Sequence, residues 1–142
     1  MGVFIVYYKT MITKEDFKNW SIIKQKLHYS NKNMIYAKAW EIWYVNIWVN
    51  IWFESMWKWK MYKRPVLVVK KLWSMFLCIS MTTKWKNNRF YYKLNNKYFN
   101  KSSYLILSQV KSNDYKRFVE KLWKLEHKDF YKIKKELKKF WF

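Results

Sequence analysis

Apolar residues recur at helical spacing near both ends of the chain. Thr13, followed by two acidic residues, is typical of a helix N-terminus, and this helix should end in the polar cluster at 30–33. After residue 129, apolar residues share one face of a predicted helix whose other face is mostly Lys. The same spacing predicts an amphipathic helix over 115–123, behind a Ser-Asn-Asp cap.

The middle of the chain shows mixed patterns. Residues 34–62 contain a tandem Val-Asn-Ile-Trp repeat that nearly matches the helical period, which predicts a long helix ending before Pro65. Other apolar runs are short and rich in β-branched or aromatic residues. They predict a strand or buried arm at 2–12, a strand at 66–69, a strand or short helix at 72–81, a basic hairpin or ordered loop at 84–96, and a strand at 104–110.

Together these elements predict a single α+β domain over residues 1–142. It would hold N-terminal helices, a central basic strand and hairpin region, and two C-terminal amphipathic helices. A length of 142 residues suits one domain and is too short for two ordinary ones.

The centre of the chain is strongly basic. The sequence carries 30 Lys and Arg against 9 Asp and Glu, a formal net charge of +21, and residues 55–113 contain thirteen bases and no acid. Aromatic residues are interleaved with these bases. Because Lys neutralises phosphates and aromatic rings stack on unpaired bases, the segment 55–113 is predicted to bind RNA. The candidate RNA-binding residues are Lys58, Lys60, Lys63, Arg64, Lys70, Lys71, Lys84, Trp85, Lys86, Arg89, Tyr91, Lys93, Lys97 and Lys101.

The composition indicates an unusual gene. Residues with AT-rich codons are abundant, whereas the chain has one Gly and one Pro. Eleven Trp residues break this pattern, because the standard Trp codon is UGG. An AT-rich gene would supply them freely if UGA were also read as Trp, as in most non-plant mitochondria and some small-genome bacteria. We infer a mitochondrial gene of a protist; drift in an AT-rich nuclear genome is the alternative, but drift alone would not raise Trp.

Residues with catalytic or metal-binding chemistry are sparse. The lone Cys78 excludes an internal disulfide and a multi-Cys zinc site, and it sits in an apolar run typical of a buried residue. His28 and His127 belong to no ligand-spaced set, and the carboxylates form no pair suited to acid–base catalysis. The sequence therefore predicts no catalytic residue, no metal site, no cofactor and no enzyme.

In composition and charge the chain resembles mitochondrially encoded ribosomal proteins of protists. The resemblance implies a structural constituent of the ribosome, an rRNA-binding component of a ribonucleoprotein in the mitochondrial matrix. Its expected partners are rRNA and neighbouring ribosomal proteins, with no small-molecule substrate.

A single-span accessory subunit of an inner-membrane respiratory or ATP synthase complex is the alternative. Residues 39–57 are long enough to cross a bilayer. However, this window includes Glu41 and Glu54, and each mid-bilayer carboxylate costs about 2.5–3.5 kcal/mol on insertion scales. We therefore expect a buried helix of a soluble protein at 39–57 rather than a membrane span.

Overall fold

The computed structural model describes residues 13–47, 63–99 and 101–142. The chain divides into two compact units, residues 1–32 and residues 33–142. The strand or arm expected at 2–12 lies outside the described residues.

The first unit contains the helix α2 (Lys14–His28). A capping box starts it: the Asp16 backbone N–H donates to the Thr13 hydroxyl at 3.2 Å, and the Thr13 backbone N–H donates to the Asp16 carboxylate at 2.8 Å. Acids in the first turn and bases in the last also match the helix dipole. The helix predicted from Thr13 is confirmed.

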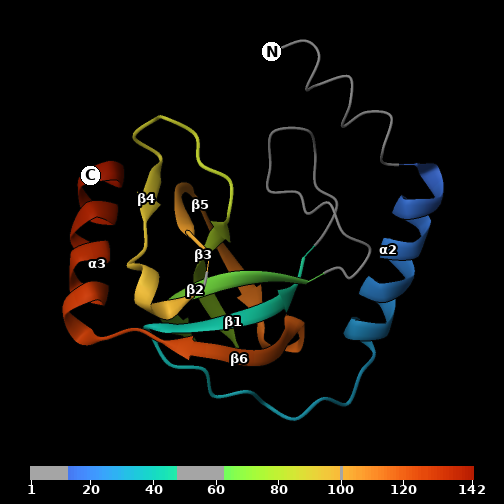
Figure 1. Cartoon of the computed structure of the whole chain (residues 1–142). Helices are drawn as coiled ribbons and strands as arrows, with labels where there is room; N and C mark the ends of the chain where they lie inside the picture. Colours follow the sequence, from blue (N-terminus) through green and yellow to red (C-terminus); the bar gives the residue numbers. More distant parts are fainter. Residues whose placement is uncertain (1–12, 48–62, 100) are drawn as a thin grey trace. The chain divides into compact units, whose positions relative to one another are not determined.

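The second unit is built on an antiparallel sheet of six strands in the order β4-β5-β3-β2-β1-β6 (Figure 1). The strands are β1 (Glu41–Asn46), β2 (Lys63–Leu72), β3 (Met75–Thr82), β4 (Tyr91–Lys93), β5 (Tyr104–Asp114) and β6 (Phe118–Lys124). Short helical turns occur at η1 (Asn96–Tyr98) and η2 (Tyr115–Arg117), and α3 (His127–Trp141) follows the last strand. The predicted helix-rich α+β fold is therefore wrong, because most of this unit is sheet.

The long helix predicted over 34–62 is the first error. Its described part contains the strand β1, which pairs with β2 on one side and β6 on the other, while residues 48–62 lie outside the described residues. The β-branched Ile42 and Val45 of β1 are fully buried, which suits a central strand. No helix in the described ranges is long and apolar enough to cross a membrane.

The helix predicted over 115–123 is the second error. The Asp114 side chain does cap a helical turn, accepting from the Lys116 backbone N–H at 2.9 Å, but that turn ends at Arg117. The chain then continues as β6 and pairs with β1. Pairing with a distant strand thus overrides apolar spacing that fits a helix equally well.

The strands predicted at 66–69 and 104–110 are confirmed as parts of β2 and β5. The run at 72–81 adopts the strand alternative, β3, and the hairpin or loop segment 84–96 contributes β4. The predicted C-terminal helix is confirmed as α3.

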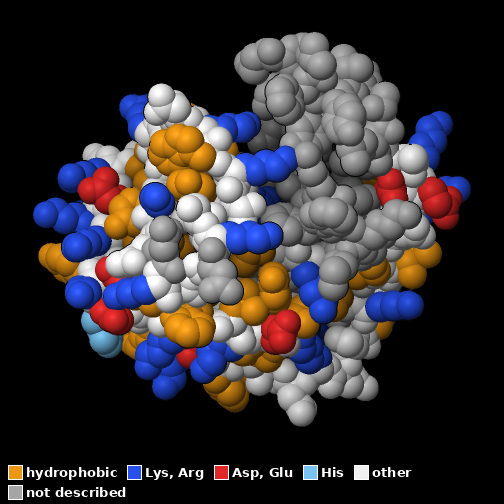
Figure 2. Space-filling model, in the orientation of Figure 1, with side chains coloured by type: hydrophobic (Ala, Val, Ile, Leu, Met, Phe, Trp, Pro, Cys, Tyr) orange, Lys and Arg blue, Asp and Glu red, His pale blue; other side chains and the backbone are white. Residues whose placement is uncertain are grey.

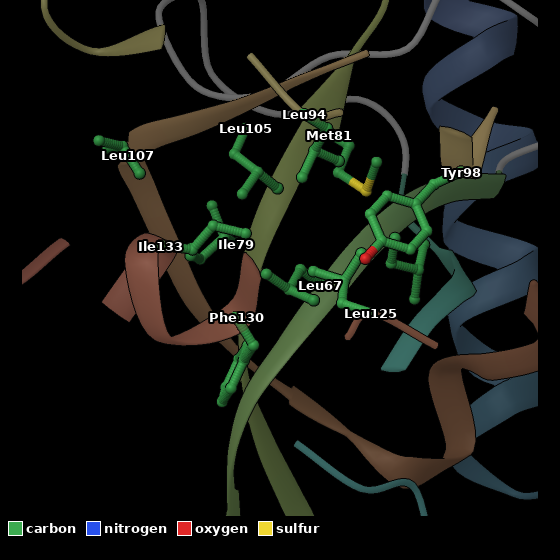
Figure 3. Close-up of a cluster of buried hydrophobic side chains, with 11 residues drawn as sticks. Leu67, Ile79, Met81, Leu94, Tyr98, Leu105, Leu107, Leu125, Phe130 and Ile133 are labelled. Carbon is green, nitrogen blue, oxygen red and sulfur yellow. The ribbon is translucent and has the colours of Figure 1, made fainter. Parts of the chain in front are cut away.

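Two groups of buried side chains hold this unit together. In the first, α3 contributes Phe130 and Ile133, which pack with Leu67, Ile79 and Leu105 of the sheet (Figure 3). The indole N–H of Trp141 also donates to the Leu107 carbonyl at 3.0 Å, which fastens the end of α3 to β5. The second group contains Val45, Val66, Val68, Phe76, Cys78 and Phe118, with Ala37 and Ile47.

Candidate anion-binding site

Arg64 is a buried cation near the start of β2. Only 4% of the surface of Arg64 is exposed, and its pairing partner across the sheet is Val45 of β1. The Arg64 Nε donates to the Met81 carbonyl of β3 at 3.2 Å. Its Nη1 is buried and has no hydrogen-bond partner among the described residues, and no described carboxylate forms an ion pair with it.

The electrostatics of Arg64 favour an anionic ligand. Burial lowers the pKa of its guanidinium to about 10, with the phenol of Tyr91 acting in the opposite direction. The group therefore remains protonated at neutral pH. Since an unpaired cation removed from water is unfavourable, a bound phosphate or carboxylate would satisfy both the charge and the free N–H groups.

A pocket of about 300 Å³ lies where β2 starts and β3 ends. Arg64 does not line this pocket, because Pro65 and its partner Tyr44 line it, whereas Arg64 and its partner Val45 lie on the other face of the sheet. The contact of Arg64 with the Met81 carbonyl is its link to the lining residues. The pocket is mainly apolar, and its polar groups are a few hydroxyls and one Lys. Its lining residues are Tyr44, Pro65, Met81, Thr82, Thr83, Phe99, Lys101, Ser103 and Leu122.

Three aromatic rings lie close together on the β3–β4 connection and the neighbouring strands. The Trp85 ring is centred 6.1 Å from that of Tyr91 and 5.0 Å from that of Tyr104. Tyr104 is paired with Thr82, which lines the pocket. Tyr91 lies close enough to Arg64 to raise the pKa of its guanidinium. Such a group of rings, with Tyr91 near Arg64, can stack on unpaired bases.

Lys97 is already paired with carboxylates. Its Nζ lies 2.9 Å from Glu126 and 3.1 Å from Asp129, and hydrogen bonding to Glu126 is the main reason why its pKa is raised. The Tyr98 hydroxyl donates to the same Asp129 carboxylate and accepts the Glu126 backbone N–H at 2.9 Å. This network connects η1 to the start of α3.

The remaining predicted RNA-binding residues are spread over the surface. Figure 2 shows Lys and Arg side chains distributed across the visible face, with fewer acidic groups among them. Lys63 and Lys101 lie near Arg64 and the pocket, whereas Lys70 and Lys71 are exposed toward the other end of β2. Lys84, Lys86 and Arg89 lie in the exposed connection from β3 to β4, Lys93 is exposed on β4, and Lys58 and Lys60 lie outside the described residues.

The sequence patterns did not predict the residues that line the pocket. Thr82 and Thr83 end the apolar run of β3, and Tyr44 and Ser103 come from segments far away in the sequence. The one local signal was the Thr pair directly ahead of a basic, aromatic segment. Among the described residues, no group of His, Cys, Asp or Glu side chains is arranged to hold a metal ion.

A buried Arg whose Nη1 has no partner among the described residues, held in an antiparallel sheet, is a group suited to binding an anion. A family model of the PemK-like, MazF-like toxins of type II toxin–antitoxin systems matches residues 38–141. The chain belongs to this family. No curated protein matches the sequence.

Solved structures share the fold at low sequence identity. A MazF from Deinococcus radiodurans is 16% identical, with a TM-score of 0.62 over 75% of this chain and 96% of that one. A MazE–MazF structure from the same organism is 15% identical, with a TM-score of 0.57 over 75% and 95% of the two chains. A mycobacterial endoribonuclease in complex with its cognate antitoxin is 9% identical, with a TM-score of 0.55 over 73% and 93%.

These findings correct the main functional predictions. Membership of a toxin family overturns both the resemblance to mitochondrial ribosomal proteins and the alternative of a membrane-complex subunit. The prediction that the chain is not an enzyme is wrong as well, because its family and fold are shared with proteins described as endoribonucleases. A toxin–antitoxin family also replaces rRNA and ribosomal proteins as the expected partners. The predicted mitochondrial location stays a prediction.

Proposed function

We propose that this chain is an RNA-cleaving toxin that binds the phosphate of the bond to be cut through Arg64. The observation that carries the proposal is the buried guanidinium whose Nη1 has no partner among the described residues, in a chain of the PemK/MazF toxin family. The mycobacterial relatives described as endoribonucleases support an RNA substrate.

Arg64 would contribute mainly through its charge. Cleavage of an RNA phosphodiester places additional negative charge on the non-bridging phosphate oxygens in the transition state. A guanidinium that is already desolvated and held by Met81 stabilises that charge with little reorganisation. Thr82, which directly follows the Met81 that Arg64 contacts, would donate from its hydroxyl to the same phosphate.

The RNA would be held on either side of the cleaved bond. A base would stack on Tyr91, and Lys101 would contact a phosphate. Lys101 lines the pocket, and the Tyr91 ring belongs to the aromatic group near Arg64. The surrounding Lys84, Lys86 and Arg89 would add attraction that depends on charge and not on base sequence.

The natural partner would be an antitoxin that supplies acidic groups. The family is defined by toxin–antitoxin pairing, and a related structure holds its cognate antitoxin. A chain with a formal net charge of +21 attracts an acidic segment, and a carboxylate could occupy the site of the phosphate at Arg64. We expect expression of the chain alone to arrest growth, and co-expression with such a partner to relieve that arrest.

The test is cleavage of a single-stranded RNA by purified protein. Arg64→Met should lower the cleavage rate by about 10²–10³, the usual effect of removing one group that stabilises transition-state charge. Arg64→Lys should recover only part of the rate, because a point charge cannot reproduce the planar fork of donors.

Lys135→Met on α3 is the matched control, since it removes the same charge from an exposed position away from the pocket. It should cleave at the unmodified rate. Full cleavage by Arg64→Met, or equal losses in the two Met variants, would contradict the proposal.

A further inference from the structure

Two residues in the described part of the chain have a positive φ angle without being Gly, and both are Trp. Trp40 has φ 66° and Trp73 has φ 58°. A side chain with a Cβ is crowded in this left-handed region, whereas Gly enters it freely. Asn and Asp tolerate it better than other residues, and Trp has no such tolerance.

Trp73 occupies a Gly position of a tight hairpin. Leu72 of β2 is paired with Met75 of β3, so Trp73 and Ser74 form the complete two-residue turn. A positive φ at the first central residue alone is the pattern of a type II′ turn, which has Gly at that place, and Gly-Ser is a typical sequence for it. The indole is 93% exposed, so its packing does not explain its presence.

Trp40 lies where two backbone segments approach its own. Its N–H donates to the Val68 carbonyl and its carbonyl accepts the Leu125 N–H, each at 2.9 Å. Its indole Nε1 is buried without a hydrogen-bond partner among the described residues. Positive φ together with close backbone contacts is what Gly provides.

Trp43, three residues away, has the features of a true Trp site. It lies in β1, its indole N–H donates to Glu41 at 2.9 Å, and its ring is centred 5.6 Å from that of Phe118. Trp20 is buried in α2. Neither Trp20 nor Trp43 has a positive φ. The ring of Trp40 is also packed, centred 4.8 Å from that of His127. Positive φ is therefore what separates positions 40 and 73 from positions 20 and 43.

We propose that the residues at 40 and 73 are Gly in the protein as its own cells make it. A codon UGA that these cells read as Gly would appear as Trp when it is translated with a UGA-Trp code, and this replaces the earlier inference that UGA is read as Trp. The two positions change eleven Trp and one Gly to nine Trp and three Gly, so the reassignment accounts for part of the unusual composition. Trp20 and Trp43 would be encoded by UGG. This proposal concerns the backbone and does not depend on the proposed RNA cleavage.

Peptide mass spectrometry of the protein from its natural cells tests the proposal directly. Peptides containing positions 40 and 73 should have the masses expected for Gly, and the residue at 43 should have the mass of Trp. The gene should carry UGA at 40 and 73 and UGG at 43. A Trp mass or a UGG codon at 40 or 73 would overturn the proposal.

Recombinant variants test the conformational reason. Trp73→Gly should raise the thermal midpoint by roughly 2–4 °C, because the turn no longer holds a crowded side chain. Trp43→Gly is the matched control and should lower the midpoint, since it removes a packed and hydrogen-bonded ring. A Trp73→Gly midpoint that is unchanged or lowered would overturn the argument from backbone conformation.

Discussion

At the scale of single residues, the sequence placed Arg64 in a set of fourteen candidates but could not single it out. Most members of that set are Lys, and the burial of Arg64 becomes visible only when β1, β2 and β3 are assembled. The free Nη1 is likewise a property of the assembled sheet. A basic segment in a sequence therefore indicates the type of ligand, while three-dimensional packing decides which cation meets it.

The buried charge of Arg64 should lower the free energy of unfolding of the protein. Replacing a buried ion pair by apolar residues of similar volume is often neutral or stabilises a protein by about 1–4 kcal/mol, and a buried cation without a carboxylate partner is less favourable still. We expect Arg64→Met to raise the free energy of unfolding in urea by about 1 kcal/mol or more while abolishing most cleavage. Loss of activity with gain of stability would exclude misfolding as its cause; a strongly destabilised variant would mean that Arg64 has a structural partner.

Cys78 should be inert in the folded protein. It is 1% exposed, and burial raises the pKa of its thiol to about 12, opposed by a hydrogen bond with Asn113. Because the thiolate is the reactive form, iodoacetamide at pH 8 should label the native chain at least tenfold more slowly than the urea-unfolded chain. Mass spectrometry of the quenched reaction measures this, and similar labelling rates would show that the strand pair β2–β3 opens readily.

At the scale of elements, prediction from sequence depended on where the stabilising contacts lie. The helix α2 was predictable because its capping box is local, contained within Thr13 and the next turn. The strands β1 and β6 were not, because each is defined by pairing with residues far away in the chain. The segment 118–124 has apolar residues at spacings that fit a helix or a strand, and pairing with β1 decides for the strand.

The junction between η1 and α3 should weaken in acid. The Tyr98 hydroxyl, followed by Lys97, lowers the pKa of Asp129 below its usual value. A carboxylate with a lowered folded-state pKa contributes stability above the unfolded value near 4, and this contribution is lost as the pH falls through the folded pKa. Asp129→Asn should therefore destabilise the protein by on the order of 1 kcal/mol at pH 7 and progressively less below about pH 4.

Urea unfolding of the two proteins between pH 7 and pH 2.5 measures the difference. Glu120→Gln, an exposed acid on β6, is the control and should follow the unmodified protein across this range. A constant difference between Asp129→Asn and the unmodified protein at all pH values would contradict an ionic role for Asp129.

At the scale of the whole molecule, salt should act in opposite directions on folding and on binding. A formal net charge of +21 repels itself, so added salt should raise the thermal midpoint of the free protein. The same salt should weaken RNA binding, because each phosphate neutralised on a single strand contributes about −0.7 to the slope of log K against log salt. Fluorescence anisotropy with Arg64→Met, which should bind RNA without cutting it, measures this slope.

A second substitution in the Arg64→Met protein shows how much of this slope of log K against log salt comes from the pocket. Lys101 lines the pocket, so adding Lys101→Met should make the slope shallower by about 0.7, whereas adding Lys135→Met on α3 should leave it unchanged. Equal changes from the two substitutions would mean that RNA is attracted by the overall charge of the chain and has no fixed path past the pocket. A slope near zero would show that the excess of Lys serves another purpose than contact with RNA.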